Sequence, residues 1–187
     1  MSRRWEPLLE QVARERYGRL VARAMLYERS RADAEDLVQD ALVATFSARG
    51  SFTSVEQAEA YVRRAIATRF LDRARRRTVE RRVLATVGAR PEQPDEIQLG
   101  LSADLRAALA TLQPRQRACV VLRHLEDLST RETAQALGLS EGAVKRYLSE
   151  AVRALNALLS LDLPVDDDLD VPVGNVDGTA RTEVRND

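Results

Sequence analysis

Apolar residues recur at helical spacing along most of this 187-residue chain, and this periodicity limits the fold more than any other feature. Residues three and four apart lie on one face of an α-helix, so each such stretch predicts an amphipathic helix. No stretch of useful length alternates with the period of two that is typical of a strand. The sequence therefore predicts an all-α protein, with helices over residues 7–28, 32–48, 55–77, 104–112, 113–125, 130–137 and 141–159.

One segment interrupts this pattern in the middle of the chain. Residues 88–96, GARPEQPDE, contain two prolines, a glycine and three acids, which is the composition of a linker. We therefore expect two small helical domains, 1–82 and 102–160, joined by a flexible linker over 83–101. Residues 161–187 are acidic and rich in turn formers, and we expect them to form a disordered tail.

The charge is distributed unevenly, although the formal net charge is zero. Residues 1–90 carry 19 arginines against 12 acids, whereas residues 164–187 carry two arginines against seven acids. Such asymmetry suggests a nucleic-acid-facing front and an acidic tail. The single cysteine, Cys119, excludes an internal disulfide and fits a reducing cytosol. No apolar run approaches the roughly 18 residues of a membrane span, so we expect a cytoplasmic protein without membrane insertion.

The strongest local signal lies between Ser129 and Arg153. Ser129 and Glu132 form a capping box, Gly138 follows a short helix, and Ser140 is placed to cap a longer one. A short helix, a tight turn and a second helix are the layout of a helix-turn-helix, whose second helix enters the major groove of DNA. An ordinary helical hairpin with a solvated polar face is the alternative interpretation.

A second signal is a stripe of arginines on the helix expected over 55–77. Arg69, Arg73, Arg76 and Arg77 follow one side of this helix, which also carries Tyr61 and Phe70. Basic side chains with aromatic residues suit single-stranded nucleic acid, because phosphates are neutralised while bases stack. Each aromatic residue taken alone is also compatible with a place in the core.

Carboxylates and a glutamine gather on the helix expected over 32–48, within the segment AEDLVQD. Its apolar stripe accounts for the buried face, which leaves Glu35, Asp36, Gln39 and Asp40 on the other faces. A carboxylate face does not favour DNA and suits a basic protein partner. The alternative is a solvated helix surface.

The order of these parts resembles the extracytoplasmic function (ECF) group of the sigma-70 family. DAEDLVQDALVATF resembles the helix that binds core RNA polymerase, and AYVRRAIATRFLDRARRR resembles the helix that melts the promoter and reads its −10 element. The run from Leu109 to Leu155 resembles the domain that reads the −35 element. The resemblance covers roughly residues 8–159, and three motifs in this order are specific to such factors.

The resemblance implies a non-catalytic, promoter-specificity subunit whose partners are core RNA polymerase, promoter DNA and an anti-sigma factor. It implies no cofactor, no metal and no small-molecule substrate. The loop 49–54 would shape a pocket for an unstacked −10 base. Core polymerase contacts are expected at Glu35, Asp36, Gln39 and Asp40. The −10 contacts are expected at Arg49, Ser51, Phe52, Tyr61, Arg64, Arg69, Arg73, Arg76 and Arg77. The −35 contacts are expected at Thr130, Arg131, Ser140, Lys145, Arg146, Ser149 and Arg153.

Two rival interpretations remain at this point. A helix-turn-helix regulator that acts without being a polymerase subunit would explain the C-terminal signal but not the acidic helix. An enzyme would need a cluster of reactive groups, and the sequence has neither a glycine-rich phosphate loop nor a metal-ligand pattern. His124 and Cys119 share one helix at a spacing of five, which does not bring them to one face.

Overall fold

The computed structural model describes residues 5–48, 52–83 and 103–160, and within these ranges it is all-α, with no strand. The helices match the expected order, and none of those described is long and apolar enough to cross a membrane. Apart from Val83, the expected linker 83–101 lies outside the described residues, as does the expected tail. Inside the expected domains, residues 1–4, 49–51 and 102 also lie outside the described residues. The elements are α1 Glu6–Glu15, α2 Tyr17–Ala24, α3 Arg31–Ser47, α4 Val55–Val83, α5 Ala103–Thr111, α6 Pro114–Val120, the π-helical turn η1 Val121–Leu125, α7 Thr130–Leu137 and α8 Glu141–Leu159.

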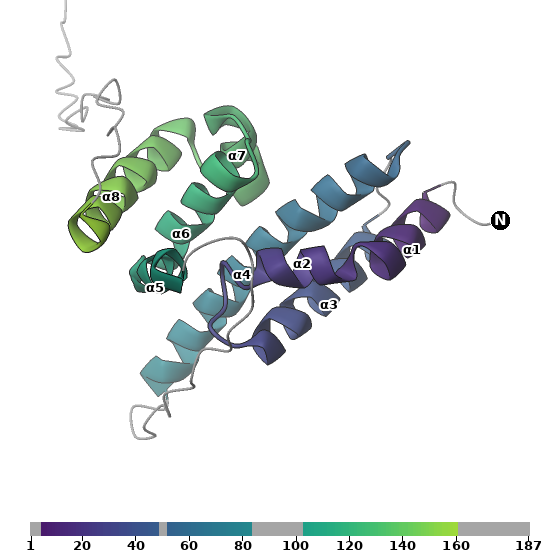
Figure 1. Ribbon diagram of the computed structural model, residues 1–187, viewed down its shortest axis with the longest axis horizontal. Coiled ribbons are helices and arrows are strands. Elements are labelled where there is room, and N and C mark those ends of the chain that lie inside the picture. The colour runs from purple at the N-terminus through teal and green to yellow at the C-terminus, as the bar shows by residue number, and fades with distance from the viewer. Residues whose placement is uncertain (1–4, 49–51, 84–102, 161–187) are drawn as a thin grey trace, which may run out of the picture.

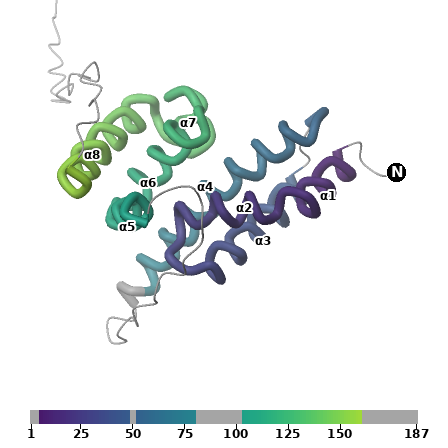
Figure 2. Tube along the Cα trace, in the orientation of Figure 1, coloured from purple at the N-terminus to yellow at the C-terminus, as the bar shows by residue number. Residues whose placement is uncertain are grey.

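The helices form two bodies that lie against each other. In Figure 1, α1 to α4 make one layered body, and α5 to α8 make a second body beside the long helix α4. The tube in Figure 2 shows α4 passing behind α2, with α3 alongside it. Helix α3 packs along α4, α6 and α7 contact α4 from the other body, and α8 packs on α5, α6 and α7. Helix α4 therefore belongs to the first body and carries most of its contact with the second.

The core of the first body follows the predicted apolar faces. Leu37, Val38 and Ala41 of α3 are fully buried, and Val62 and Ile66 of α4 are at most 1% exposed. Ser30 caps α3, since its hydroxyl accepts a hydrogen bond from the Asp33 N–H at 3.1 Å. These faces are the ones that the helical periodicity predicted, so the fold of this body is set mainly by local pattern.

The single helix expected over residues 7–28 is wrong, because two helices occupy this range. Arg16 has φ −112° and ψ 1°, which is outside the α-helical region, and separates α1 from α2. Gly18, a poor helix former, follows within the first turn of α2. The Arg16 guanidinium also lies 3.9 Å from the Glu59 carboxylate of α4. Arg16, the residue at the break, therefore separates α1 from α2 and contacts α4.

The helix expected over 113–125 also differs, because its last turn is widened. Residues Val121–Leu125 form a π-helical turn, and the Glu126 N–H donates to the Val121 carbonyl at 3.1 Å, five residues back. The Leu128 N–H donates to the Leu122 carbonyl at 3.0 Å, and Asp127 has φ 52°. Widened turns of this kind occur frequently at functional sites. This turn directs Leu125 and Glu126 toward the first body.

Candidate nucleic-acid interface

The helix-turn-helix is formed by α7 and α8, and its turn has the predicted chemistry. The Ser129 hydroxyl accepts from the Glu132 N–H at 3.2 Å, and the Glu132 carboxylate accepts from the Ser129 N–H at 2.9 Å. The Ser129 N–H and hydroxyl both donate to the Glu132 carboxylate, and these hydrogen bonds lower the pKa of Glu132. Gly138 ends α7 with φ 63°, and Ser140 caps α8 by accepting from the Ala143 N–H at 3.1 Å. The predicted capping box, glycine terminus and serine cap are therefore confirmed.

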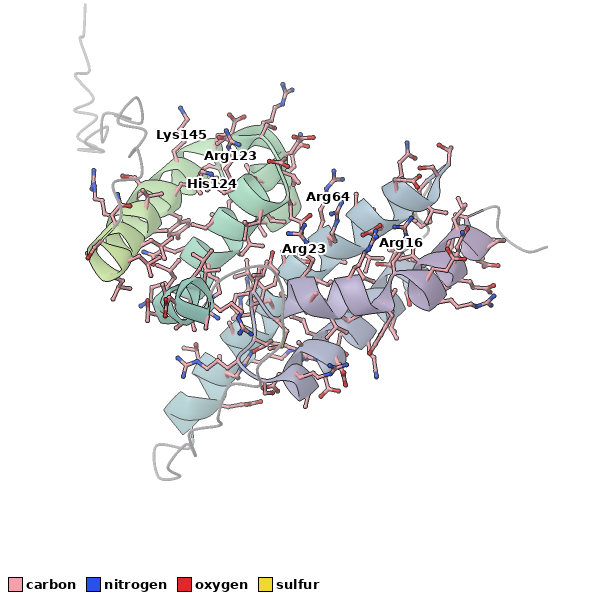
Figure 3. All side chains as sticks on the ribbon, viewed as in Figure 1. Arg16, Arg23, Arg64, Arg123, His124 and Lys145 are labelled. Atoms are coloured by element: carbon pink, nitrogen blue, oxygen red, sulfur yellow. The ribbon has the colours of Figure 1, made fainter. Side chains whose placement is uncertain are left out.

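The two helices of this motif are held together by a small apolar seam. Val144 and Ala151 are fully buried, and Ala134 and Leu148 are 5% and 8% exposed. Figure 1 shows α8 on the outer side of the second body, away from α1 to α3. Figure 3 shows Lys145 of α8 pointing away from the first body, on a side where a DNA duplex has access to it.

The polar face of α8 carries the expected −35 residues. Lys145 and Ser149 are half-buried, and Arg146 is exposed. The Arg146 guanidinium lies 5.1 Å from the centre of the Tyr147 ring, and its Nε is 3.8 Å from the Glu150 carboxylate. These two weak contacts hold the guanidinium along the helix surface, in reach of a groove edge.

The remaining −35 candidates lie at both ends of the motif. Thr130 is half-buried and Arg131 is exposed at the start of α7, while Arg153 is exposed one turn beyond Ser149. The Ser140 hydroxyl is occupied as the cap of α8, so its hydrogen-bonding capacity toward DNA is reduced. Except for Ser140, these side chains remain placed for contact with DNA at the rim of the motif.

The acidic helix α3 presents an exposed stripe along its length. Asp36, Gln39, Asp40 and Val43 are exposed and follow helical spacing. Glu35 pairs with Arg31 within the helix at 2.6 Å, and its side chain is 35% exposed. Among the described residues, Asp36 and Gln39 make no side-chain hydrogen bond or ion pair. These two are therefore the members of the expected set that remain available to a protein partner.

The acidic stripe and the arginine stripe, expected to serve different partners, meet in one groove. The Asp40 carboxylate receives both Nε and Nη2 of Arg73, at 3.0 and 2.6 Å. Arg69 and Arg76 line the same groove between α3 and α4, which encloses about 600 Å³. Val43 also lines it and is 66% exposed, although this residue was not among the expected contacts. The sequence does contain a signal for Val43, because it is an apolar residue on the otherwise polar side of the helix.

Two of the expected arginines are committed to ion pairs inside the first body. Arg73 pairs with Asp40, and Arg77 donates to the nearly buried Glu28 carboxylate at 2.7 and 3.3 Å. Arg69 lies 3.6 Å from Asp72 on its own helix. The stripe is therefore partly neutralised, and Arg76 is the member without an ion pair among the described residues.

The aromatic residues near the expected base pocket differ in availability. Phe52 is only 7% exposed, and its ring centre lies 5.9 Å from both the Trp5 and the Tyr61 rings. The expectation that Phe52 contacts a base is therefore corrected, because both neighbouring rings bury it in the core. Tyr61 is 38% exposed and keeps one face open. Arg49 and Ser51 lie outside the described residues.

The second body lies close to the part of α4 expected to meet the −10 element. Tyr61, Arg64 and Thr68 line a hollow of about 370 Å³ whose opposite wall includes Gln135 and Ala136 of α7. Figure 3 shows Arg64 and Arg23 on the side of the first body that faces the second. The expected −10 surface is therefore partly covered by the helix-turn-helix body.

A buried arginine joins the two bodies. Arg117 of α6 is 7% exposed and donates to the Tyr27 carbonyl at 2.5 Å and to the Ala110 carbonyl at 2.6 Å. Its guanidinium lies 5.5 Å from the Phe70 ring centre. Burial lowers the pKa of Arg117 to about 10, and its Nε has no hydrogen-bond partner among the described residues. The contact between the bodies therefore includes a charged group that is incompletely compensated.

Within residues 5–48, 52–83 and 103–160, no three histidine, cysteine or acidic side chains gather as a metal site. Cys119 is fully buried, and burial raises the pKa of its thiol to about 12. A thiol of this kind stays protonated and unreactive at neutral pH.

Comparisons with known proteins agree with this arrangement. The family model for sigma-70 region 2 matches residues 3–80, and the model for sigma-70 region 4 matches residues 102–155. The RNA polymerase sigma-E factor of Streptomyces coelicolor is 38% identical over 135 residues, covering 70% of this chain and 75% of that protein. The ECF RNA polymerase sigma factor SigM of Mycobacterium tuberculosis is 29% identical over 151 residues, covering 80% and 76%.

A solved structure shows the same fold in a complex. The sigma factor RpoE of Bartonella quintana, crystallised with the anti-sigma factor NepR, superposes with a TM-score of 0.61 at 25% identity, covering 85% of this chain and 99% of that one. Sequence and structure relatives thus agree on both bodies and on their order. The chain belongs to the sigma-70 family as an ECF sigma factor, a non-catalytic subunit of RNA polymerase that directs promoter-specific transcription initiation.

Proposed function

We propose that the two bodies divide promoter recognition between them. The observation that supports this division is that Lys145, on the polar face of α8, points away from the first body. Lys145, Arg146 and Ser149 on this face would dock on the −35 element, with Thr130, Arg131 and Arg153 at the rim. Arginine and lysine side chains at the start of such a helix read guanine edges or hold phosphates.

The first body would bind core polymerase and the −10 element. Asp36 and Gln39, which have no partner among the described residues, together with the apolar Val43, would face a basic and polar surface of core polymerase. Charge complementarity of this kind sets register and association rate. The open face of Tyr61 would stack on an unpaired −10 base, and Arg64 and Arg76 would hold phosphates of the same strand.

The domain boundaries follow from the same assignment. Residues 1–82 would form the region that binds core polymerase and the −10 element, and 102–160 the region that binds the −35 element. Residues 83–101 would join them, and 161–187 would remain an acidic tail. An anti-sigma factor is a proposed partner because the similar RpoE was crystallised with one. The working place of such a subunit would be the cytoplasm, where core polymerase and promoter DNA meet.

Transcription in vitro with core polymerase on a library of promoter fragments tests this assignment. The wild-type chain is expected to give transcripts from defined start sites. Alanine at Lys145, Arg146 and Arg153 together should abolish −35 preference, since one base-reading arginine contributes about 1–3 kcal/mol.

A control for this variant is Arg14→Ala combined with Arg19→Ala, which removes two exposed charges from α1 and α2 of the first body. It should leave the −35 preference unchanged. A triple variant with unchanged start sites and unchanged −35 preference would show that α8 does not dock in the proposed orientation.

A further inference from the structure

Two arginines of the first body converge on one carboxylate of the second. The side chain of Glu126 is 4% exposed, and its two oxygens lie 3.5 Å from Arg23 Nε and 2.9 Å from Arg63 Nη1. Arg23 also donates from Nη1 to the Leu125 carbonyl at 3.1 Å. Neither arginine belongs to the surfaces described so far for polymerase or DNA. We propose that Arg23 and Arg63 form a phosphate-binding site for a strand of promoter DNA, and that Glu126 occupies this site while the two bodies are packed together.

The backbone of the second body is shaped to deliver this carboxylate. The π-helical turn Val121–Leu125 ends at Glu126, and Asp127 follows with φ 52°, a conformation that is unusual outside glycine. An ordinary α-helical turn would place the carbonyl of Leu125 and the side chain of Glu126 elsewhere. The irregular turn therefore serves the contact with Arg23 and Arg63, at a cost in local backbone energy.

A carboxylate fills this site incompletely. Two guanidinium groups face one carboxylate, and the buried Nε of Arg63 has no hydrogen-bond partner among the described residues. Burial raises the pKa of Glu126, although Arg63 and Arg23 oppose the rise, so the charged carboxylate is held here at a cost. A phosphate offers more acceptor oxygens and matches the planar fork of arginine, so it suits the unused donors better.

The site lies in line with the proposed −10 surface. Arg63 precedes Arg64 on α4, and both line a hollow of about 170 Å³ that is closed on its other side by Glu126 and Glu132. Figure 3 shows Arg23 and Arg64 near each other on the side of the first body that faces the second. A strand that follows α4 from Tyr61 would therefore meet Arg64, Arg63 and Arg23 once the second body moved away.

Promoter geometry requires this movement, a step that rests on the proposed function. The −10 and −35 elements are centred about 25 base pairs apart, which at 3.4 Å per base pair is roughly 85 Å. In the packed arrangement, α7 instead lies directly against α4. Residues 84–102, which connect the bodies, reach at most about 65 Å when fully extended, and the remaining ~20 Å lies within the width of the two bodies, so the chain is long enough for this separation.

Binding of the full chain to a labelled single strand of about twelve nucleotides tests the site without polymerase, because single-strand sites span about 4–16 nucleotides. Fluorescence anisotropy across a salt series gives the affinity and its salt slope. Arg63→Gln should weaken binding about 3- to 10-fold and reduce the slope by about 0.7, the loss of one phosphate contact. Arg23→Gln should act in the same direction, and an analogue strand with an uncharged backbone should not respond to either substitution.

The competing carboxylate is tested by reversing its charge. The control is Asp127→Lys, which makes the same charge change one residue away, on an exposed side chain. Glu126→Lys should increase the affinity for the strand about 3- to 10-fold more than this control does. In the Arg63→Gln background this extra gain should disappear, because the two residues share one site. Circular dichroism confirms that each variant is folded.

Three results would overturn the proposal: an unchanged salt slope in both arginine variants, equal gains from the two lysine substitutions, or no strand binding by any variant. Start-site selection by core polymerase is a separate readout. Its failure would refute the proposed function while leaving the strand test interpretable.

Discussion

Gly138 turns the chain between α7 and α8, and replacing it measures the free-energy cost of a left-handed backbone conformation at this turn. Gly138 has φ 63°, and a Cβ added there meets no heavy atom within 4 Å, so Gly138→Ala adds no clash. The cost then lies in the left-handed conformation, about 1–2 kcal/mol for an L-residue. Alanine also lowers the conformational entropy of the unfolded chain, which stabilises the folded state by about 0.4–1 kcal/mol. The net loss is about 1 kcal/mol, or a decrease of roughly 4–8 °C in the Tm of a domain of this size.

Two controls separate this explanation from a general effect of adding a methyl group. Gly138→Asn should cost less than Gly138→Ala, because asparagine tolerates the left-handed region better. Gly18→Ala places a methyl group in equally open space, but inside α2 and without a positive φ, so it should stabilise the first body by about 0.5–1 kcal/mol.

Urea and thermal unfolding measure both effects. Far-ultraviolet circular dichroism reports the helices of both bodies, and fluorescence of Trp5, the one tryptophan of the chain, reports the first. The Gly138 variants should therefore change the circular dichroism transition, and Gly18→Ala should change the fluorescence transition. A Gly138→Ala protein as stable as the wild type would refute the argument, as would equal losses for alanine and asparagine.

Three further predictions use other parts of the molecule. Asp36→Arg combined with Gln39→Ala should weaken binding to core polymerase at unchanged helical content; binding at wild-type strength would make that face of α3 a solvated surface. Cys119 should resist thiol reagents at pH 7 in the folded chain and react after unfolding in urea, because burial raises its pKa to about 12. Because burial raises the pKa of Glu126 above 4.5, protonation favours packing of the two bodies; this contribution is complete below pH 4.5 and is lost as the pH rises through the raised pKa. Energy transfer between dyes on Gln11→Cys and Ala157→Cys should therefore increase as the pH falls from 7 through the raised pKa of Glu126, and the increase should be absent in Glu126→Gln.

The helix-turn-helix could be predicted from the sequence nearly to the residue because its determinants are local. Ser129, Glu132, Gly138 and Ser140 act through hydrogen bonds and backbone angles within four residues of themselves. Such signals do not depend on the rest of the fold, so the pattern alone placed α7 at residues 130–137. The apolar faces of α3 and α4 were predictable for the same reason.

The partners of the charged residues could not be predicted, because they depend on how helices pack. Arg73 with Asp40 and Arg77 with Glu28 join residues 33 and 49 positions apart. On a single helix the arginines form a stripe that resembles a free nucleic-acid surface. Packing of α4 on α3 turns part of that stripe toward carboxylates, which is why the predicted DNA set is larger than the set that remains available.

The π-helical turn and the burial of Phe52 were missed for a related reason. No residue in VLRHL has a local preference for a widened turn, and the turn becomes favourable through contacts that Leu125 and Glu126 make with Arg23 and Arg63. Phe52 was assigned to a loop, where an aromatic side chain suggests stacking on a base. Its actual surroundings are the rings of Trp5 and Tyr61, one of them 47 positions away in the chain.

The distribution of paired charges has a consequence for how DNA and the packed arrangement affect each other. If Arg23 and Arg63 hold a phosphate as proposed, Glu126 and the DNA strand compete for the same two guanidinium groups. Thermodynamic linkage then requires that DNA binding shift the packing equilibrium toward separated bodies by the same factor by which separation increases the affinity for DNA. Adding a single strand should lower the energy transfer between Gln11→Cys and Ala157→Cys in the wild-type chain, and less so in Arg63→Gln. A strand that binds without changing the energy transfer would mean that binding and packing are independent, and that Glu126 pairs with the two arginines only to hold the bodies together.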